Sequence, residues 1–158
     1  MSMYRRLQCP ILCIVALLLA ACSTTGPAPG PETSSLRQEI VSIARAQIGK
    51  PYRYGGRSPR QGFDCSGLVQ YAHRQAGLEI PRTAREQLGH GRPVSSRHIR
   101  PGDLLFFSVT GKPDHVALYL GDGVFVHAPS SGKKVSTERL DNPWWRRRLV
   151  AVRSFIRP

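Results

Sequence analysis

The sequence predicts one α+β domain in which helices precede an antiparallel sheet. Two observations support this fold class: apolar residues recur at helical spacing in the first half of the chain, and short strand-like segments follow from Asp103 onward. Helices followed by strands favour an antiparallel sheet, because alternation of the two is typical of parallel βαβ units. A chain of 158 residues, 41% of them hydrophobic, has room for one such core.

The first helix is expected near Ser35 to Ile48. Ser35 is a suitable N-cap, and Gly49 with Pro51 would end the helix. Its apolar positions follow a period close to 3.6, which is typical of a helix packed on a core. They are Leu36, Ile40, Ile43, Ala44 and Ile48.

Two further helices are expected after a loop at 52–62, which is rich in Gly, Pro and Arg. The second helix begins near Asp64 or Cys65 and ends at Gly77, and a short third helix covers 83–88. The second helix therefore carries Cys65 at its N-terminus.

The second half of the chain predicts short strands. Residues of high strand propensity alternate there with polar ones between Gly- and Pro-containing turns. The expected strands cover 104–109, 115–120, 124–128, a weak segment near Val135, and 150–156.

The loop length decides which side chains share a face in the hairpin at 115–128. A two-residue turn would put the aliphatic residues of the two strands on opposite faces, whereas a three-residue loop at 121–123, with Leu120 opposite Val124, puts them together. We predict the three-residue loop because it gives one continuous apolar face. That face consists of Val116, Leu118, Leu120, Val124, Val126 and Ala128.

The same register predicts a pair of histidines on the other face. Ala117 then lies opposite His127, so His115 is diagonal to His127 at about 7 Å between backbones, which two imidazoles can bridge. A cysteine at a helix N-terminus beside an imidazole is in an environment that lowers the thiol pKa. Cys65 as nucleophile, His115 as base and His127 as the group that orients the base satisfy the logic of Cys-His catalysis.

The N-terminus has the layout of a signal peptide over residues 1–21. Arg5 and Arg6 precede an apolar run that is too short to serve as a stable membrane span. Leu-Ala-Ala-Cys at 19–22 resembles the bacterial lipobox, which implies a lipid on Cys22 and membrane attachment through it. The alternative is an ordinary cleaved signal. Residues 22–34, rich in Pro, Gly, Ser and Thr, are expected to form a flexible tether.

The charge balance is strongly basic, with 23 Lys and Arg against 10 Asp and Glu. The basic residues are scattered and accompany no nucleic-acid-binding motif, so we expect no nucleic-acid partner. Of the four cysteines, Cys9 and Cys13 would leave with the signal peptide and Cys22 would be lipidated. Cys65 then remains as one unpaired, reactive thiol.

Six short motifs follow one another along the chain. They are Pro-Tyr-Arg-Tyr-Gly-Gly at 51–56, Asp-Cys-Ser-Gly at 64–67, Pro-Arg-Thr at 81–83, Pro-Gly-Asp-Leu at 101–104, His-Val-Ala-Leu-Tyr-Leu-Gly at 115–121 and His-Ala at 127–128. This ordered set resembles the NlpC-type cell-wall peptidases, which have a papain-like fold. The resemblance extends over about 36–156, nearly the whole chain after the tether, and implies a domain at 35–158.

The resemblance implies an enzyme that cuts the peptide stems of peptidoglycan without a cofactor, and we expect it to be a monomer. It implies that Cys65 is the nucleophile, His115 the base and His127 the third polar member. It also implies that Tyr54 contributes to the oxyanion site. Asp64 and Ser66 would lie beside charged groups of the substrate. Ser23 after Cys22 implies the periplasmic face of the outer membrane. Two bonds remain candidates for cleavage: the bond between D-glutamate and diaminopimelate within one stem, and the cross-link between neighbouring stems. The resemblance to lipoproteins that act in the growth of Gram-negative walls slightly favours the cross-link.

Two other functions fit parts of the pattern. One cysteine and two histidines could hold zinc, although their spacing matches no recognised zinc motif. A catalytically silent peptidoglycan-binding or scaffold lipoprotein could use the same fold. The pair Trp144-Trp145 is expected to pack in the core near the sheet edge, with a sugar platform as the alternative.

Overall fold

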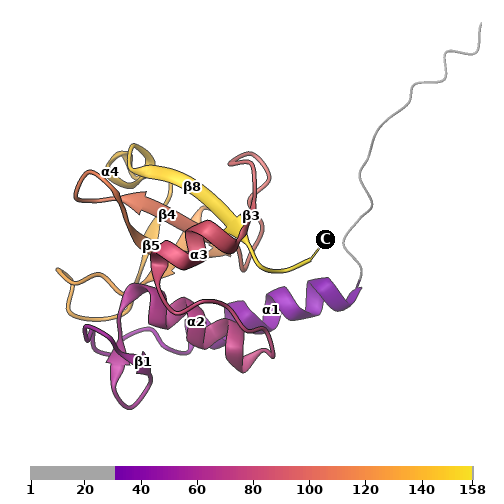
Figure 1. Ribbon diagram of the computed structural model, residues 1–158, viewed down its shortest axis with the longest axis horizontal. Coiled ribbons are helices and arrows are strands. Elements are labelled where there is room, and N and C mark those ends of the chain that lie inside the picture. Colours follow the sequence, from indigo (N-terminus) through magenta and orange to yellow (C-terminus); the bar gives the residue numbers. More distant parts are fainter. Residues whose placement is uncertain (1–30, 158) are drawn as a thin grey trace, which may run out of the picture.

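The computed structural model describes residues 31–157 as helices packed on an antiparallel sheet (Figure 1). The predicted signal peptide, Cys22 and tether residues 22–30 lie outside the described residues. The helices are α1 (Pro31–Arg45), α2 (Cys65–Gln75), α3 (Ala84–His90) and α4 (Pro143–Arg146). The strands are β1 (Arg57–Ser58), β2 (Gly62–Phe63), β3 (Arg92–Pro93), β4 (Leu104–Ser108), β5 (Pro113–Gly121), β6 (Val124–His127), β7 (Ser136–Arg139) and β8 (Leu149–Ser154).

The six-stranded sheet has the order β3-β8-β4-β5-β6-β7, with every neighbouring pair antiparallel. One face packs on α1 and α2 through a core that includes Ile40, Leu68 and Val116. The other face is buried in a second cluster that includes Phe107, Phe125 and Trp145 of α4. The predicted α+β class is therefore confirmed, and both faces of the central strands are covered.

The helix α1 begins at Pro31, four residues before the predicted start at Ser35. Proline suits the first turn because the backbone N–H groups there have no helical partner, and Glu32 suits it because the helix dipole favours an acidic residue at this end. Residues 31–34, which we assigned to the flexible tether, are thus part of the helix.

Among the helices of the described part, none is long and apolar enough to cross a membrane.

The other two predicted helices are confirmed, and their caps explain where they begin. Asp64 is the N-cap of α2, where its side chain accepts a hydrogen bond from the Gly67 N–H. Thr83 caps α3 in a reciprocal arrangement with Glu86. The sequence analysis missed β1, β2, β3 and α4, which are two to four residues long and too short to show a period.

The hairpin keeps the predicted register but not the predicted loop. Leu118 pairs with Val126 and Tyr119 with Phe125, and then a bulge lets Gly121 pair with Val124. The turn therefore has two central residues, Asp122 and Gly123, and both have positive φ angles. The bulge absorbs the extra residue, so the faces of the strands are the predicted ones.

Candidate active site

Cys65 is the first residue of α2, and its side chain packs against the edge of the core. Burial raises the pKa of the Cys65 thiol, and the Asp64 carboxylate adds to this, while backbone N–H groups of Val116 and Ser66 act in the opposite direction. The expected lowering of the thiol pKa is thus contradicted, because removal of the sulfur from water outweighs the stabilisation of a thiolate. At neutral pH the resting cysteine is a thiol.

The predicted pairing of the two histidines is confirmed. His115 Nε2 and His127 Nδ1 are 2.9 Å apart, within hydrogen-bond distance. Burial lowers the pKa of His115 to about 4, against a smaller opposing effect of Asp114. Burial and the neighbouring His115 lower the pKa of His127 to about 3. Both imidazoles are therefore neutral near pH 7, so His115 can accept a proton.

The backbone of β5 brings His115 towards Cys65. Val116, the next residue along β5, belongs to the same core cluster as Cys65, and its backbone N–H opposes the rise in the pKa of the Cys65 thiol. If His115 donates its Nε2–H to His127, its Nδ1 keeps a free lone pair for the thiol proton. Within residues 31–157 no hydrogen bond joins the thiol and His115, and such contacts commonly form only when substrate binds.

An aromatic cluster explains why the histidines are so poor at binding protons. The Trp145 ring lies 5.8 Å from that of His115 and 5.0 Å from that of His127, measured between centroids. Phe107 and Phe125 complete the cluster at 4.9 Å and 5.3 Å from Trp145. Trp145 is thus a core residue, as predicted. The same prediction is wrong for Trp144, which is 39% exposed and carries the Arg148 guanidinium over its ring at 4.0 Å.

The structure brings Tyr52 to the thiol instead of Tyr54. The side chain of Tyr54 is 91% exposed. Tyr52 packs partly buried against the same cluster as Cys65, and burial together with the nearby Cys65 raises the pKa of its hydroxyl. The sequence analysis named Tyr54 and missed Tyr52, although both belong to one motif, because a loop of this kind has no period to show which side chain turns inward.

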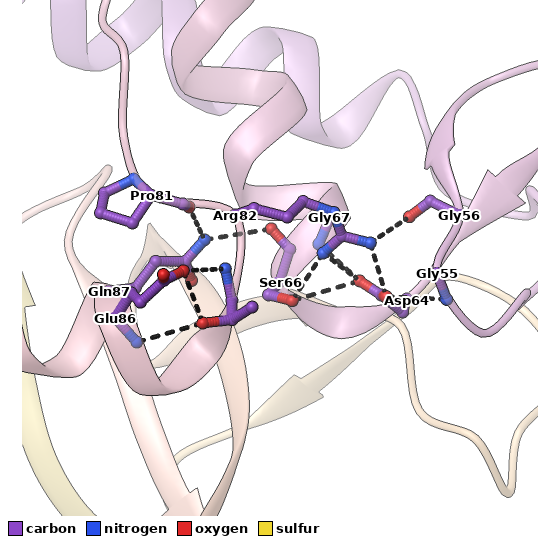
Figure 2. Close-up of polar contacts among 10 residues, drawn as sticks. Gly55, Gly56, Asp64, Ser66, Gly67, Pro81, Arg82, Glu86 and Gln87 are labelled. Carbon is purple, nitrogen blue, oxygen red and sulfur yellow. Dashed lines mark hydrogen bonds and ion pairs between the residues drawn. The ribbon is translucent and has the colours of Figure 1, made fainter.

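Asp64 and Ser66, which were expected beside charged groups of the substrate, have their polar groups engaged within the protein (Figure 2). One Asp64 carboxylate oxygen accepts the Gly67 N–H at 2.6 Å, and the other accepts the Gly55 N–H at 2.9 Å. Arg82 donates to both oxygens, at 3.1 and 2.7 Å, and to the Ser66 hydroxyl at 2.9 Å. This network joins the loop that carries Tyr54, the start of α2 and the segment before α3.

Gly67 and Gln87 complete the same network. A Cβ on Gly67 would collide with the Gly56 carbonyl oxygen, so only glycine allows the loop to lie against the first turn of α2. The buried Gln87 of α3 donates to the Ser66 and Pro81 carbonyl oxygens at 3.2 and 2.8 Å. Cys65 therefore lies where three segments meet: the loop at 55–56, the first turn of α2, and residues 81–87.

Replacement of Arg82 by methionine should raise the thiol pKa of Cys65. Arg82 neutralises the Asp64 carboxylate, whose charge already raises that pKa, so an unpaired carboxylate would oppose the thiolate more strongly. We expect a rise of roughly half to one pH unit, and a reaction with iodoacetamide at pH 7 that is about 3- to 10-fold slower. Alkylation rates measured from pH 6 to 10 would locate the pKa.

The control variant for this experiment is Arg85→Met, which removes an exposed positive charge three residues away in α3. Arg85→Met should leave the alkylation profile unchanged. A folded Arg82→Met protein with the wild-type profile would show that Arg82 has no electrostatic effect on the thiol.

The described residues offer no ligand set for the zinc alternative. Within 31–157, no three His, Cys, Asp or Glu side chains lie close enough together to hold a metal ion. The arrangement that the structure does present is a partly buried thiol near two neutral imidazoles that are within hydrogen-bond distance of each other.

Comparison with known families assigns the domain to one of them. The model described as the NlpC/P60 family matches residues 49–154, which include Cys65 and both histidines. The chain belongs to the NlpC/P60 family. As in NlpC/P60 proteins of known structure, the domain combines helices with an antiparallel sheet.

Three curated relatives differ in their named activities and in how much of their length matches this chain. Murein DD-endopeptidase MepH of Escherichia coli (strain K12) is 38% identical over 88% of this chain and 53% of its own length. Murein DD-endopeptidase MepS/Murein LD-carboxypeptidase of the same strain is 37% identical over 90% of this chain and 88% of its own length. Gamma-DL-glutamyl hydrolase of Bacillus subtilis (strain 168) is 41% identical over 73% of this chain and 29% of its own length. The chain thus spans about half of MepH, less of the Bacillus protein and most of MepS.

Two solved structures place this domain among NlpC/P60 folds. A crystal structure of an NlpC/P60 family protein from Bacillus cereus ATCC 10987 has a TM-score of 0.72 and 30% identity, covering 83% of this chain and 42% of that one. The peptidoglycan hydrolase RipB of Mycobacterium tuberculosis has a TM-score of 0.70 and 31% identity, covering 84% of this chain and 73% of that one.

Proposed function

We propose that this protein is a cysteine endopeptidase that cuts peptidoglycan peptides, with Cys65 as nucleophile, His115 as base and His127 as the residue that orients the base. The observation that carries the proposal is the hydrogen-bonded histidine pair, in which His127 is buried and His115 is half-buried. His115 directly precedes Val116, whose backbone N–H interacts with the Cys65 thiol at the start of α2. The relatives named as murein endopeptidases support the substrate class.

The proposed reaction begins with both groups neutral. His115 Nδ1 takes the thiol proton as the sulfur attacks the peptide carbonyl carbon, and the backbone N–H of Cys65 stabilises the oxyanion. His115 then gives the proton to the leaving nitrogen, which departs as an amine and leaves a thioester on Cys65. Water, deprotonated by His115, hydrolyses the thioester and restores the thiol. Tyr54, or Tyr52 which lies nearer, would supply a second donor to the oxyanion.

Digestion of purified peptidoglycan tests this function and identifies the bond. The protein should release defined fragments whose masses distinguish cleavage between D-glutamate and the diamino acid from cleavage of the cross-link. Prior alkylation with iodoacetamide should abolish release, while a chelator should not affect it. Absence of any release would favour the silent scaffold, and loss of release with the chelator would favour a metal enzyme.

We further propose that Cys22 carries lipid and holds the domain at the periplasmic face of the outer membrane as a monomer. The Leu-Ala-Ala-Cys sequence after the apolar run supports this. Mass spectrometry of the mature N-terminus tests it, and an unmodified N-terminal residue other than Cys22 would exclude it.

A further inference from the structure

A group of basic side chains lies near the start of α2, and the proposed reaction makes no use of it. Residues 46–63 and 130–136 contain six Lys and Arg and no Asp or Glu. The six, which we call the basic face, are Lys50, Arg53, Arg57, Arg60, Lys133 and Lys134. All are exposed, and none forms an ion pair within residues 31–157. Their charge is therefore available to an anionic partner.

Backbone hydrogen bonds join the two segments of the basic face, although they are distant in the sequence. The Tyr52 N–H donates to the Lys133 carbonyl oxygen at 2.7 Å, and the Val135 N–H donates to that of Lys50 at 2.8 Å. Lys133 has a φ angle of 57°, in the left-handed region that favours glycine. The fold thus gathers these cations, and it holds a lysine where the backbone alone would favour a residue without charge.

The basic face contains a hollow of about 360 Å³ between the loop before β1 and the turn that joins β1 to β2. Arg53 and Arg60 line it together with Tyr54, whose side chain is 91% exposed. No Asp or Glu among the described residues lines it. Guanidinium groups and a phenol hydroxyl are donors that suit a carboxylate, so the hollow fits an anionic group.

The basic face lies next to Cys65. Asp64, which caps the helix that begins at Cys65, accepts the Gly55 N–H at 2.9 Å, and Tyr52 packs against the same core cluster as Cys65. Arg82 already pairs with Asp64 at 2.7 Å, so this carboxylate does not cancel the charge of the basic face. A partner bound to the basic face is therefore held beside the nucleophile.

We propose that the basic face binds polymeric peptidoglycan through carboxylates of stems that neighbour the one being cut. The inference rests on the proposed function and concerns groups outside the reacting peptide. D-Glutamate and diaminopimelate each have two carboxyl groups, of which the peptide chain uses one, so a polymer of such stems is a polyanion. Several exposed cations together attract a polyanion more strongly than a single surface ion pair does, and salt weakens this attraction.

The position of the basic face favours the polymer over an anionic membrane. A flat lipid surface against this face would also cover the start of α2 and separate Cys65 from its substrate. A stretch of polymer bound at the same place instead supplies further stems to the nucleophile. Anionic lipid is therefore the competing partner in the test.

Sedimentation with purified peptidoglycan tests the proposal on a Cys65→Ala background, which leaves the polymer intact. Lys50→Gln, Lys133→Gln and Lys134→Gln together, the face variant, remove three charges and keep the backbone hydrogen bonds of these residues. At about 50 mM NaCl we expect the face variant to bind roughly 10-fold more weakly than the parent. At about 500 mM NaCl the two should bind alike, because the charges are then screened within a few ångströms.

The control variant combines Arg74→Gln, Arg85→Gln and Arg97→Gln, which remove the same charge at exposed sites outside the two segments. It should bind as tightly as the parent. Equal weakening of the control and face variants would show that net charge alone acts, and would overturn the basic face as a site. Peptidoglycan whose carboxyl groups have been converted to amides should bind the parent as weakly as native peptidoglycan binds the face variant, and undiminished binding would exclude the carboxylates.

Two further measurements separate the remaining outcomes. Binding of the parent to phosphatidylglycerol vesicles but not to peptidoglycan, with loss in the face variant, would replace the polymer by a membrane. A short synthetic stem peptide has no neighbouring stems, so the face substitutions with Cys65 retained should leave kcat/KM for it unchanged, and a loss there would overturn the role of neighbouring stems. Peptidoglycan that wild-type protein leaves uncut, while charge-dependent binding persists, would overturn the endopeptidase and leave the basic face standing.

Discussion

Cys65→Ala should reduce kcat for peptidoglycan peptides by about 10⁴- to 10⁶-fold, which is the largest effect that we expect from a single substitution. Loss of an enzyme nucleophile commonly has this magnitude, because the covalent route is closed and only binding and the oxyanion site remain. Cys65 is the one cysteine of the described residues, so no neighbouring thiol there can replace it. Initial rates on a synthetic stem peptide would measure the effect.

The fold of Cys65→Ala should be intact, which makes the result interpretable. The side chain is partly buried at the edge of the core, and the caps and ion pair that hold the first turn of α2 come from Asp64 and Arg82. The unfolding midpoint should therefore stay close to that of the wild type. A folded variant that retained a tenth of the wild-type rate would rule out Cys65 as the nucleophile.

Arg37→Met should destabilise the domain by about 3–5 kcal/mol, because it leaves Asp103 charged, buried and unpaired. Arg37 of α1 donates to Asp103 at 2.9 Å and to the Pro101 carbonyl oxygen at 2.7 Å, and its side chain also reaches Ser154 of β8. The side chains of Arg37 and Asp103 are only 8% and 2% exposed. Urea unfolding of the variant and the wild type would measure the difference in free energy.

A double variant distinguishes the ion pair from simple loss of packing. Arg37→Met with Asp103→Leu removes both charges, so much of the lost stability should return. The Arg100 N–H, which Asp103 accepts at 2.9 Å, would lose its partner and limit the recovery. A double variant as unstable as the sum of the two single variants would show that the charges are not coupled.

The positions of the histidines could be predicted because a strand has a simple period. Alternating side chains, together with an apolar face that must be buried, fixed the register of β5 and β6 and brought His115 next to His127. Both ends of α2 were equally predictable. Asp64 is a good N-cap, and Gly77 follows the C-cap residue Ala76 with a positive φ angle. The loop conformation was wrong, yet the bulge preserved the register.

Residues that act through long-range contacts could not be predicted. Arg82 lies 18 positions from Asp64, and only the folded chain brings the guanidinium to both carboxylate oxygens. Trp145 was expected in the core, but its contact with both imidazoles depends on the position of α4 over the sheet. The raised pKa of the Cys65 thiol likewise depends on burial, which the sequence around a helix start does not show.

Among the described residues β8 is the last strand, yet it lies inside the sheet between β3 and β4. Trp145, which covers the histidine pair, comes only a few residues before it. A chain synthesised from its N-terminus therefore contains Cys65 and both histidines before it contains Trp145 and β8, which enclose them. Long-range strand pairing of this kind is also slow to form. A chain that ends before Leu149 would therefore retain Cys65, His115 and His127 but lack the strand that joins β3 to β4.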